Sequence, residues 1–148
     1  MKFSEITRGR VIELGPRRVS EAEIIAFARQ YDPQPFHVDP AKAAATRWRG
    51  LIASGWMTAS MAMELVVPGI LQGSGSIGSP GIDKLEWLHP VRPGDELRLR
   101  VTVLDSQLSK SGSTGVVRWE WQFDNQEGIA VMRLVATSLF DVTGKTAG

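Results

Sequence analysis

The sequence predicts an α+β domain in which an antiparallel sheet wraps around one apolar helix. Residues 55–67 form an apolar run whose only charge is Glu64, and a helix without a polar face is expected to be buried. From residue 82 onward, polar and apolar residues alternate in long segments separated by turns, which is typical of antiparallel strands. Helices followed by strands favour an α+β class, and 148 residues predict a single domain spanning 1–148.

The first elements are a short extended segment and a capped helix. Residues 7–14 are expected to form a strand or extended arm that ends at the Gly-Pro pair of residues 15–16. Ser20 and Glu23 have the spacing of a capping box, which predicts a helix over residues 20–30.

A proline-rich loop follows this helix. Pro33 disfavours helical backbone at the residue before it, so the helix is expected to end near Tyr31. Pro33 and Pro35 also fix their own φ angles, so ordering the loop over residues 32–37 costs little conformational entropy. Asp39, followed directly by a proline, predicts an N-cap that opens a short helix over residues 41–45.

The apolar helix is expected to end at the Pro-Gly pair of residues 68–69, and the glycine-rich residues 72–81 are expected to form a loop with possible extended ends. At least four strands plus the N-terminal one are predicted, the four being residues 82–88, 96–108, 116–124 and 129–142. Trp119, Trp121 and Phe123 share one face of the third of these strands, and the two tryptophans are interpreted as core or dimer contacts.

Composition excludes several classes of function. The net charge is +1 and the 17 basic residues are scattered, so neither nucleic acid nor an anionic membrane is expected as a partner. The chain has no cysteine, which excludes disulfides and thiolate chemistry. Its first residues have no apolar run long enough for a signal peptide, and no segment has about 18 consecutive apolar residues, so no membrane span is expected. A soluble cytoplasmic protein is the expectation.

Asp32 and His37 are the candidate chemical groups. An acid and an imidazole in one rigid loop can both reach a single water or substrate proton, as general acid–base catalysis requires. The alternative is that Asp32 caps the chain locally and His37 is a structural loop histidine. The residues alone leave both readings open.

The stretch DPQPFHVDPAKAAATRWRGLIASG, residues 32–55, resembles the hydratase-2 motif of the MaoC-like family, which includes (R)-specific enoyl-CoA hydratases and related dehydratases. That motif runs Asp, any residue, Asn, Pro, any residue, His, any residue, Asp, then a helix and a glycine-led entry into a central helix. A weaker similarity lies in PVRPGDEL, residues 90–97. The resemblance implies the hot-dog fold, an antiparallel sheet wrapped around a long helix.

The resemblance also implies a function. Asp32 and His37 take the positions of an acid–base pair that holds one water, for reversible conversion of a 2-enoyl-CoA into an (R)-3-hydroxyacyl-CoA. Gly55 takes the position whose backbone N–H binds the thioester carbonyl, with Ser54 and Trp56 beside it as substrate-binding candidates. No metal or redox cofactor is implied, because coenzyme A arrives as part of the acyl-CoA substrate. A homodimer or higher homo-oligomer is expected.

Three positions depart from the family pattern. Gln34 replaces the motif asparagine, Ser54 replaces a common histidine, and a small polar residue used by some members falls at or near Met63. Two alternatives to a hydratase remain. One is a hot-dog thioesterase using Glu64, and the other is a non-catalytic subunit that binds acyl thioesters. Acyl chain length and the carrier of the thioester are not determined.

Other conspicuous residues are expected to be structural. His89 is assigned to its turn, and three methionines are assigned to core packing: Met57, Met61 and Met63. Three arginines are assigned to the solvated surface, with contact to coenzyme phosphates as the alternative: Arg47, Arg49 and Arg92.

Overall fold

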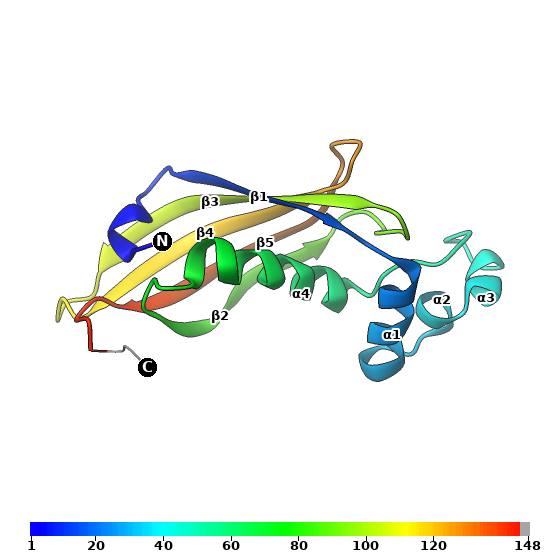
Figure 1. Cartoon of the computed structure of the whole chain (residues 1–148), viewed down its shortest axis with the longest axis horizontal. Helices are drawn as coiled ribbons and strands as arrows, with labels where there is room; N and C mark the ends of the chain where they lie inside the picture. Colours follow the sequence, from blue (N-terminus) through cyan, green and yellow to red (C-terminus); the bar gives the residue numbers. More distant parts are fainter. Residues whose placement is uncertain (146–148) are drawn as a thin grey trace.

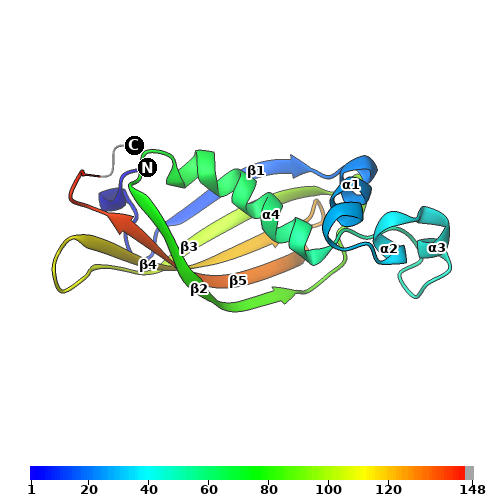
Figure 2. The same ribbon diagram turned by 90° about the horizontal axis from the view of Figure 1, so that it is seen from below.

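A five-stranded antiparallel sheet curves around helix α4 (Gly55–Val66) in the computed structural model, which describes residues 1–145 (Figure 1, Figure 2). The strands are β1 (Val11–Arg18), β2 (Ser76–Trp87), β3 (Glu96–Leu108), β4 (Thr114–Asp124) and β5 (Ala130–Asp141). Their spatial order is β1-β3-β4-β5-β2, so β1 and β2 are the two edges. The predicted α+β arrangement and five strands are confirmed.

The smaller helices gather at the end of the sheet where α4 begins (Figure 1). They are α1 (Glu21–Tyr31), α2 (Pro35–Val38) and α3 (Pro40–Ala44), with a 3-10 turn, Phe3–Glu5, at the opposite end of the molecule. The predicted capping box is confirmed, because Ser20 Oγ accepts from the backbone N–H of Glu23 at 3.2 Å and the Glu23 carboxylate accepts from Ser20. Asp39 likewise caps α3 by accepting from the Lys42 amide.

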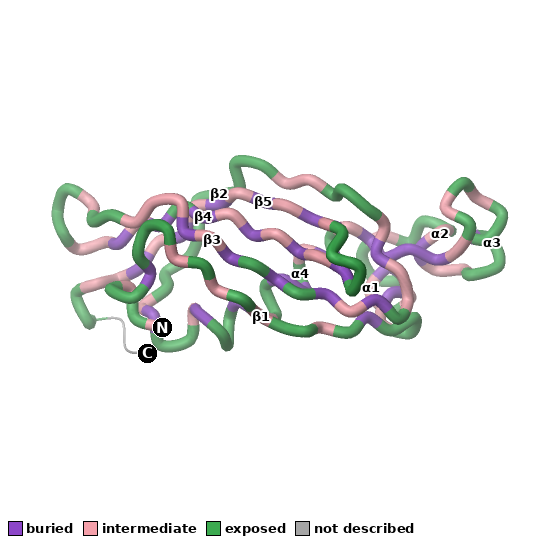
Figure 3. Tube along the Cα trace, turned by 90° about the horizontal axis from the view of Figure 1, so that it is seen from above, coloured by how far each residue is buried: buried purple, intermediate pink, exposed green. Residues whose placement is uncertain are grey.

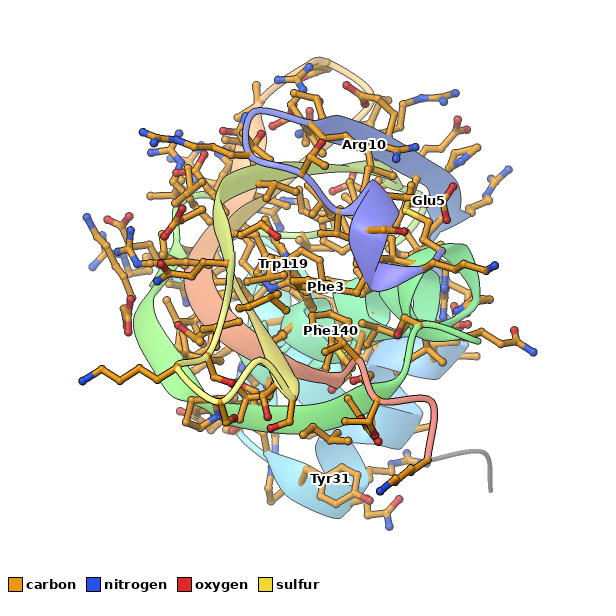
Figure 4. All side chains as sticks on the ribbon, turned by 90° about the vertical axis from the view of Figure 1, so that its left-hand side faces the viewer. Phe3, Glu5, Arg10, Tyr31, Trp119 and Phe140 are labelled. Carbon is orange, nitrogen blue, oxygen red and sulfur yellow. The ribbon has the colours of Figure 1, made fainter. Side chains whose placement is uncertain are left out.

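The core lies between α4 and the concave face of the sheet. Burial alternates along β3, β4 and β5, as expected for strands with one covered face (Figure 3). Trp119 and Phe123 are fully buried, and Trp121 is 6% exposed, so these aromatic residues belong to the core. Figure 4 shows Trp119 meeting Phe140 in the interior, and their ring centroids lie 6.1 Å apart.

Strand β1 extends further than the sequence predicts. It continues through the Gly15-Pro16 pair to Arg18. The register with β3 shifts between Leu14 and Arg17, which marks a bulge at the Gly-Pro pair. A proline is tolerated there because β1 is an edge strand and a bulge leaves one residue unpaired.

The loop predicted over residues 72–81, with possible extended ends, is shorter than expected. β2 begins at Ser76 and runs through Gly78 and Gly81, with register irregularities at both glycines. Pairing with the regular strand β5 holds this glycine-rich segment extended despite its weak strand propensity. The apolar helix also does not stop at Pro68, because a π-helical turn, Val67–Leu71, continues from α4.

Only one face of α4 is buried. Met57 and Met61 are in the core as predicted, but the core assignment of Met63 is wrong, since it is 42% exposed. Trp56 is also exposed, at 56%. The sheet covers one side of the helix, so these apolar residues on its other side stay about half exposed. No helix among the described residues is long and apolar enough to cross a membrane.

Candidate active site

The two candidate chemical groups meet at the end of α1. Asp32 is the C-cap of α1, and His37 lies in the helical turn α2 rather than in the loop that the sequence predicts. Pro35 at the first position of α2 explains this turn, since its fixed φ suits a helix N-terminus. His37 Nε2 lies 3.2 Å from Asp32 Oδ2, and the imidazole is almost fully buried. The five-residue spacing thus places the acid and the imidazole in direct contact.

The tautomer of His37 follows from its second contact. Nδ1 lies 2.7 Å from the backbone carbonyl oxygen of Ile52, and a carbonyl oxygen only accepts, so Nδ1 carries a proton. Nε2 is then the basic nitrogen, and it faces a carboxylate oxygen of Asp32. Nε2 and Oδ2 are both hydrogen-bond acceptors, so their contact at 3.2 Å requires a proton between the two atoms or a separate donor bonded to them. The Asp32–His37 pair is therefore arranged to hold or exchange one proton.

Two further side chains hold the Asp32 carboxylate. Gln34 Nε2 donates to Oδ1 at 2.8 Å, and Ser54 Oγ donates to Oδ2 at 2.7 Å. Burial on its own would raise the pKa of Asp32, but these two hydrogen bonds and the charge of His37 outweigh it and lower the pKa. Two of the three positions that depart from the family pattern, Gln34 and Ser54, thus contact the acid directly.

We predict that Ser54→Ala raises the pKa of Asp32. The hydroxyl stabilises the charged carboxylate, so its loss favours the protonated form and the carboxyl titrates at higher pH. Carbon NMR of the Asp32 carboxyl across an acidic titration measures the shift. Ser60→Ala is the matched control, because Ser60 donates to the Trp56 carbonyl on the same helix. An Asp32 titration unchanged in Ser54→Ala contradicts the assigned role.

The segment from Leu51 to Ser54 links this pair to the central helix. It is buried, and its backbone is fixed by two bonds, from the Ile52 amide to the Phe36 carbonyl and from the Ala53 amide to the Val91 carbonyl. The chain therefore enters α4 directly beside His37, with Ser54 as N-cap and Gly55 as the first helical residue.

The N-terminus of α4 is left without a side-chain cap. Ser54 occupies the N-cap position but makes no capping hydrogen bond, because its hydroxyl donates to Asp32 instead. The first backbone N–H groups of a helix have no partner inside it and carry its positive dipole end. The Gly55 amide is accordingly a donor available for an acceptor atom of a ligand, next to the Asp32–His37 pair.

His37 and Gly55 line one pocket of about 290 Å³, which we call the catalytic pocket. Three of its other lining residues were not assigned a functional role from the sequence: Thr58, Trp87 and His89. Thr58 lies on the buried face of α4, one turn after Gly55, and its position follows from helical periodicity. Trp87 and His89 come from the end of β2 and the turn after it, which no local pattern connects to Gly55.

The other candidates lie elsewhere. Trp56 does not line the catalytic pocket; it lines a second, apolar cavity together with Met63. Glu64, the thioesterase candidate, forms an ion pair with Arg17 at 3.0 Å and is exposed. Arg92 donates to the Trp48 carbonyl. Among residues 1–145, no cluster of three or more His, Asp or Glu side chains has the arrangement of a metal site.

Comparisons with known proteins identify the family and the fold. A family model described as a MaoC-like domain matches residues 4–122. The chain belongs to the MaoC-like family. Its fold matches the crystal structure of a MaoC-like dehydratase from Rhodospirillum rubrum, with 38% identity and a TM-score of 0.87 over 95% of this chain and 97% of that one.

Two other solved structures are also similar to this MaoC-like chain. The (R)-hydratase PhaJ1 from Pseudomonas aeruginosa is 26% identical, with a TM-score of 0.76 over 95% of this chain and 84% of that one. A structure from Archaeoglobus described as a monoamine oxidase regulatory protein is 31% identical, with a TM-score of 0.85 over 95% of this chain and 94% of that one. The hot-dog fold is confirmed, and the family supports a hydratase or dehydratase activity in general terms.

Proposed function

We propose that this MaoC-like protein catalyses the reversible hydration of a 2-enoyl-CoA to an (R)-3-hydroxyacyl-CoA. The observation that carries the proposal is the contact between His37 Nε2 and Asp32 Oδ2 at 3.2 Å, beside a helix N-terminus whose cap serine is bonded to the same acid. A purely structural subunit needs neither a coupled acid–base pair nor an uncapped helix end beside it.

In the hydration direction, the pair holds one proton and one water. The water oxygen attacks the β-carbon of the enoyl thioester while its proton passes to His37 Nε2. Asp32 orients the water and delivers the proton that the pair already held to the α-carbon. The pair again holds one proton at the end of the reaction, so no other acid or base is consumed.

The negative charge that develops during this reaction lies on the thioester oxygen. The backbone N–H of Gly55 at the start of α4 is the donor proposed to receive it. Because Gly55 and His37 line the same pocket, one bound thioester can meet both groups. The proposal uses no metal ion and no redox cofactor.

The proposed partner is a second copy of the chain. β2 is an edge strand whose outer side pairs with no strand among residues 1–145, and its exposed residues include Ile77 and Ile82. Beside it, α4 exposes Trp56 and Met63. An apolar helix face next to a free strand edge supports a homodimer joined along β2 and α4.

The test is an assay of the purified protein with crotonyl-CoA. A hydratase is expected to remove the ultraviolet absorbance of the enoyl thioester without releasing free thiol and without a second protein. Thiol release instead of hydration contradicts the proposal and favours a thioesterase. Activity that appears only after a partner protein is added favours a non-catalytic subunit.

A further inference from the structure

The loop that follows α3 brings basic side chains to the catalytic pocket. Residues 40–63 contain no acidic residue and three basic ones: Lys42, Arg47 and Arg49. Trp48, between the two arginines, lines the catalytic pocket together with His37 and Gly55. The net charge of the whole chain is only +1, so this loop is a local concentration of positive charge beside the pocket.

This loop is fixed in place by hydrogen bonds. The backbone amide of Arg49 donates to the Thr46 carbonyl at 3.0 Å. A third arginine joins the loop to a second segment, because Arg92 Nη2 donates to the Trp48 carbonyl at 2.6 Å. Arg92 belongs to the turn after β2, and residues 88–91 of that turn line the same pocket. The loop and the turn are therefore tied together where they border the catalytic pocket.

Arg47 is held in a position that leaves its hydrogen-bond donors free. Its guanidinium carbon lies 5.4 Å from the centroid of the Trp48 ring, which is a cation–π contact. Stacking uses the flat face of a guanidinium, so the five N–H groups around its edge remain available. Arg47 is exposed and Trp48 is half-buried. The contact therefore places a planar cation at the surface, on a residue that lines the catalytic pocket.

No carboxylate pairs with these arginines in the part of the chain that the structure describes, residues 1–145. Arg47, Arg49 and Arg92 form no ion pair there, whereas other arginines on the sheet are bonded to acidic side chains. Asp95 follows Arg92 closely, but its oxygens accept from the Arg92 backbone amide at 2.9 Å and from Gln126 at 3.0 Å. The guanidinium donors thus remain available to an anionic ligand.

We infer that this cluster binds phosphate groups of coenzyme A and so selects the carrier of the thioester. Arg47 and Arg49 are the donors, and Arg92 holds the loop through the Trp48 carbonyl. The inference rests on the proposed function. In an acyl-CoA, the pantetheine arm separates the phosphates from the thioester, so a thioester at Gly55 places the phosphates outside the pocket. A guanidinium binds phosphate there through two parallel N–H···O bonds.

The experiment compares KM for crotonyl-CoA with KM for crotonyl-pantetheine, which has the same arm without phosphates. The KM for crotonyl-CoA is expected to rise about fivefold in Arg47→Gln, and further in the double variant Arg47→Gln/Arg49→Gln. kcat is expected to stay within about twofold, because the phosphates are bound equally in the ground and transition states. An equal rise in KM for both substrates, or no rise for crotonyl-CoA in the double variant, overturns the inference.

The matched control is Arg8→Gln. Arg8 is exposed and lies beside the Phe3–Glu5 turn, at the opposite end of the molecule from α3 (Figure 1). Its loss changes the net charge equally and is expected to leave KM for crotonyl-CoA unchanged. Salt gives a second readout, since it screens exposed charges. The native KM for crotonyl-CoA is expected to rise with ionic strength, and a rise equally steep in the double variant contradicts the site.

Crotonyl-phosphopantetheine distinguishes coenzyme A from the other common carrier of acyl thioesters. It has the single phosphate that an acyl carrier protein also presents, and it lacks the nucleotide phosphates. The arginine variants are expected to change its KM less than that of crotonyl-CoA. Effects of equal size on the two substrates mean that the cluster recognises only the shared phosphate, which contradicts selection for coenzyme A.

A binding measurement separates this inference from the proposed function. Calorimetric titration with coenzyme A itself involves no hydration, and the double variant is expected to bind it about tenfold more weakly than the native protein and Arg8→Gln. If the native protein hydrates nothing but this difference in affinity is found, the proposed function fails and the phosphate site stands. If the native protein hydrates crotonyl-pantetheine with the same KM as crotonyl-CoA, hydration stands and the phosphate site fails.

Discussion

Asp32→Asn and His37→Gln are each expected to lower kcat for enoyl-CoA hydration by about 10² to 10⁴-fold, the usual range for loss of a general acid or base. Asparagine still offers an oxygen to the Ser54 hydroxyl but does not exchange a proton. Glutamine at position 37 still reaches the Ile52 carbonyl but offers no basic nitrogen. Both variants are therefore expected to keep the fold, which thermal unfolding checks.

The double variant adds a second measurement. Because Asp32 and His37 share one proton, removal of either disables the unit, and the double variant is expected to be little slower than the slower single one. Asp39→Asn is the matched control, since Asp39 only caps α3 and asparagine caps equally well. Full activity in both single variants contradicts the mechanism, as does a loss in Asp39→Asn as large as in Asp32→Asn.

Removal of the Gly55 amide is expected to lower kcat by about 10² to 10³-fold, the range found when one donor to a developing oxyanion is lost. Gly55→Pro deletes this N–H while keeping the helix, because proline is well tolerated at the first helical position. The preceding Ser54 has φ −58° and ψ 137°, an extended conformation that suits a following proline.

The matched control for this substitution is Gly55→Ala, which adds a Cβ atom but retains the N–H. Since any Cβ atom at this position overlaps Trp87, both variants are made in a Trp87→Ala background. The comparison of the proline and alanine variants in that background then reports the amide alone. Equal kcat values for the two contradict a role for the Gly55 amide in binding the thioester oxygen.

Much of the fold follows from local sequence signals. The capping box at Ser20, the Asp39-Pro40 helix start and the strict alternation along β4 each specify an element through short-range chemistry, and each is present in the structure. The contact between Asp32 and His37 is also local, because five residues and two prolines leave the chain little freedom. These features depend on neighbours in sequence, so a single sequence suffices to predict them.

Other features depend on contacts between distant segments. Ser54 is recognisable as a departure from the family motif, but its bond to Asp32 requires α1 and α4 to be placed in space. The packing of Trp87 on Gly55 depends on how β2 curves past the helix. β2 itself begins in a glycine-rich segment that only its pairing with β5 holds extended.

The exposed face of the apolar helix α4 is a further feature that the sequence alone does not predict. Its composition predicts burial on every side, yet Trp56 and Met63 are exposed because the sheet covers only one face. An apolar sequence pattern predicts that a surface is buried, but it does not predict whether the same chain or another molecule buries that surface.

The most direct test of the central claim follows the oxygen atom of water. The purified protein is incubated with crotonyl-CoA in water enriched in heavy oxygen, and the product is analysed by mass spectrometry and chiral chromatography. The proposed mechanism predicts heavy oxygen on the β-carbon of an intact (R)-3-hydroxybutyryl-CoA, formed by the native protein and almost absent with Asp32→Asn. Heavy oxygen found only in the carboxylate of a released acid, or a labelled product formed equally well by Asp32→Asn, would contradict it.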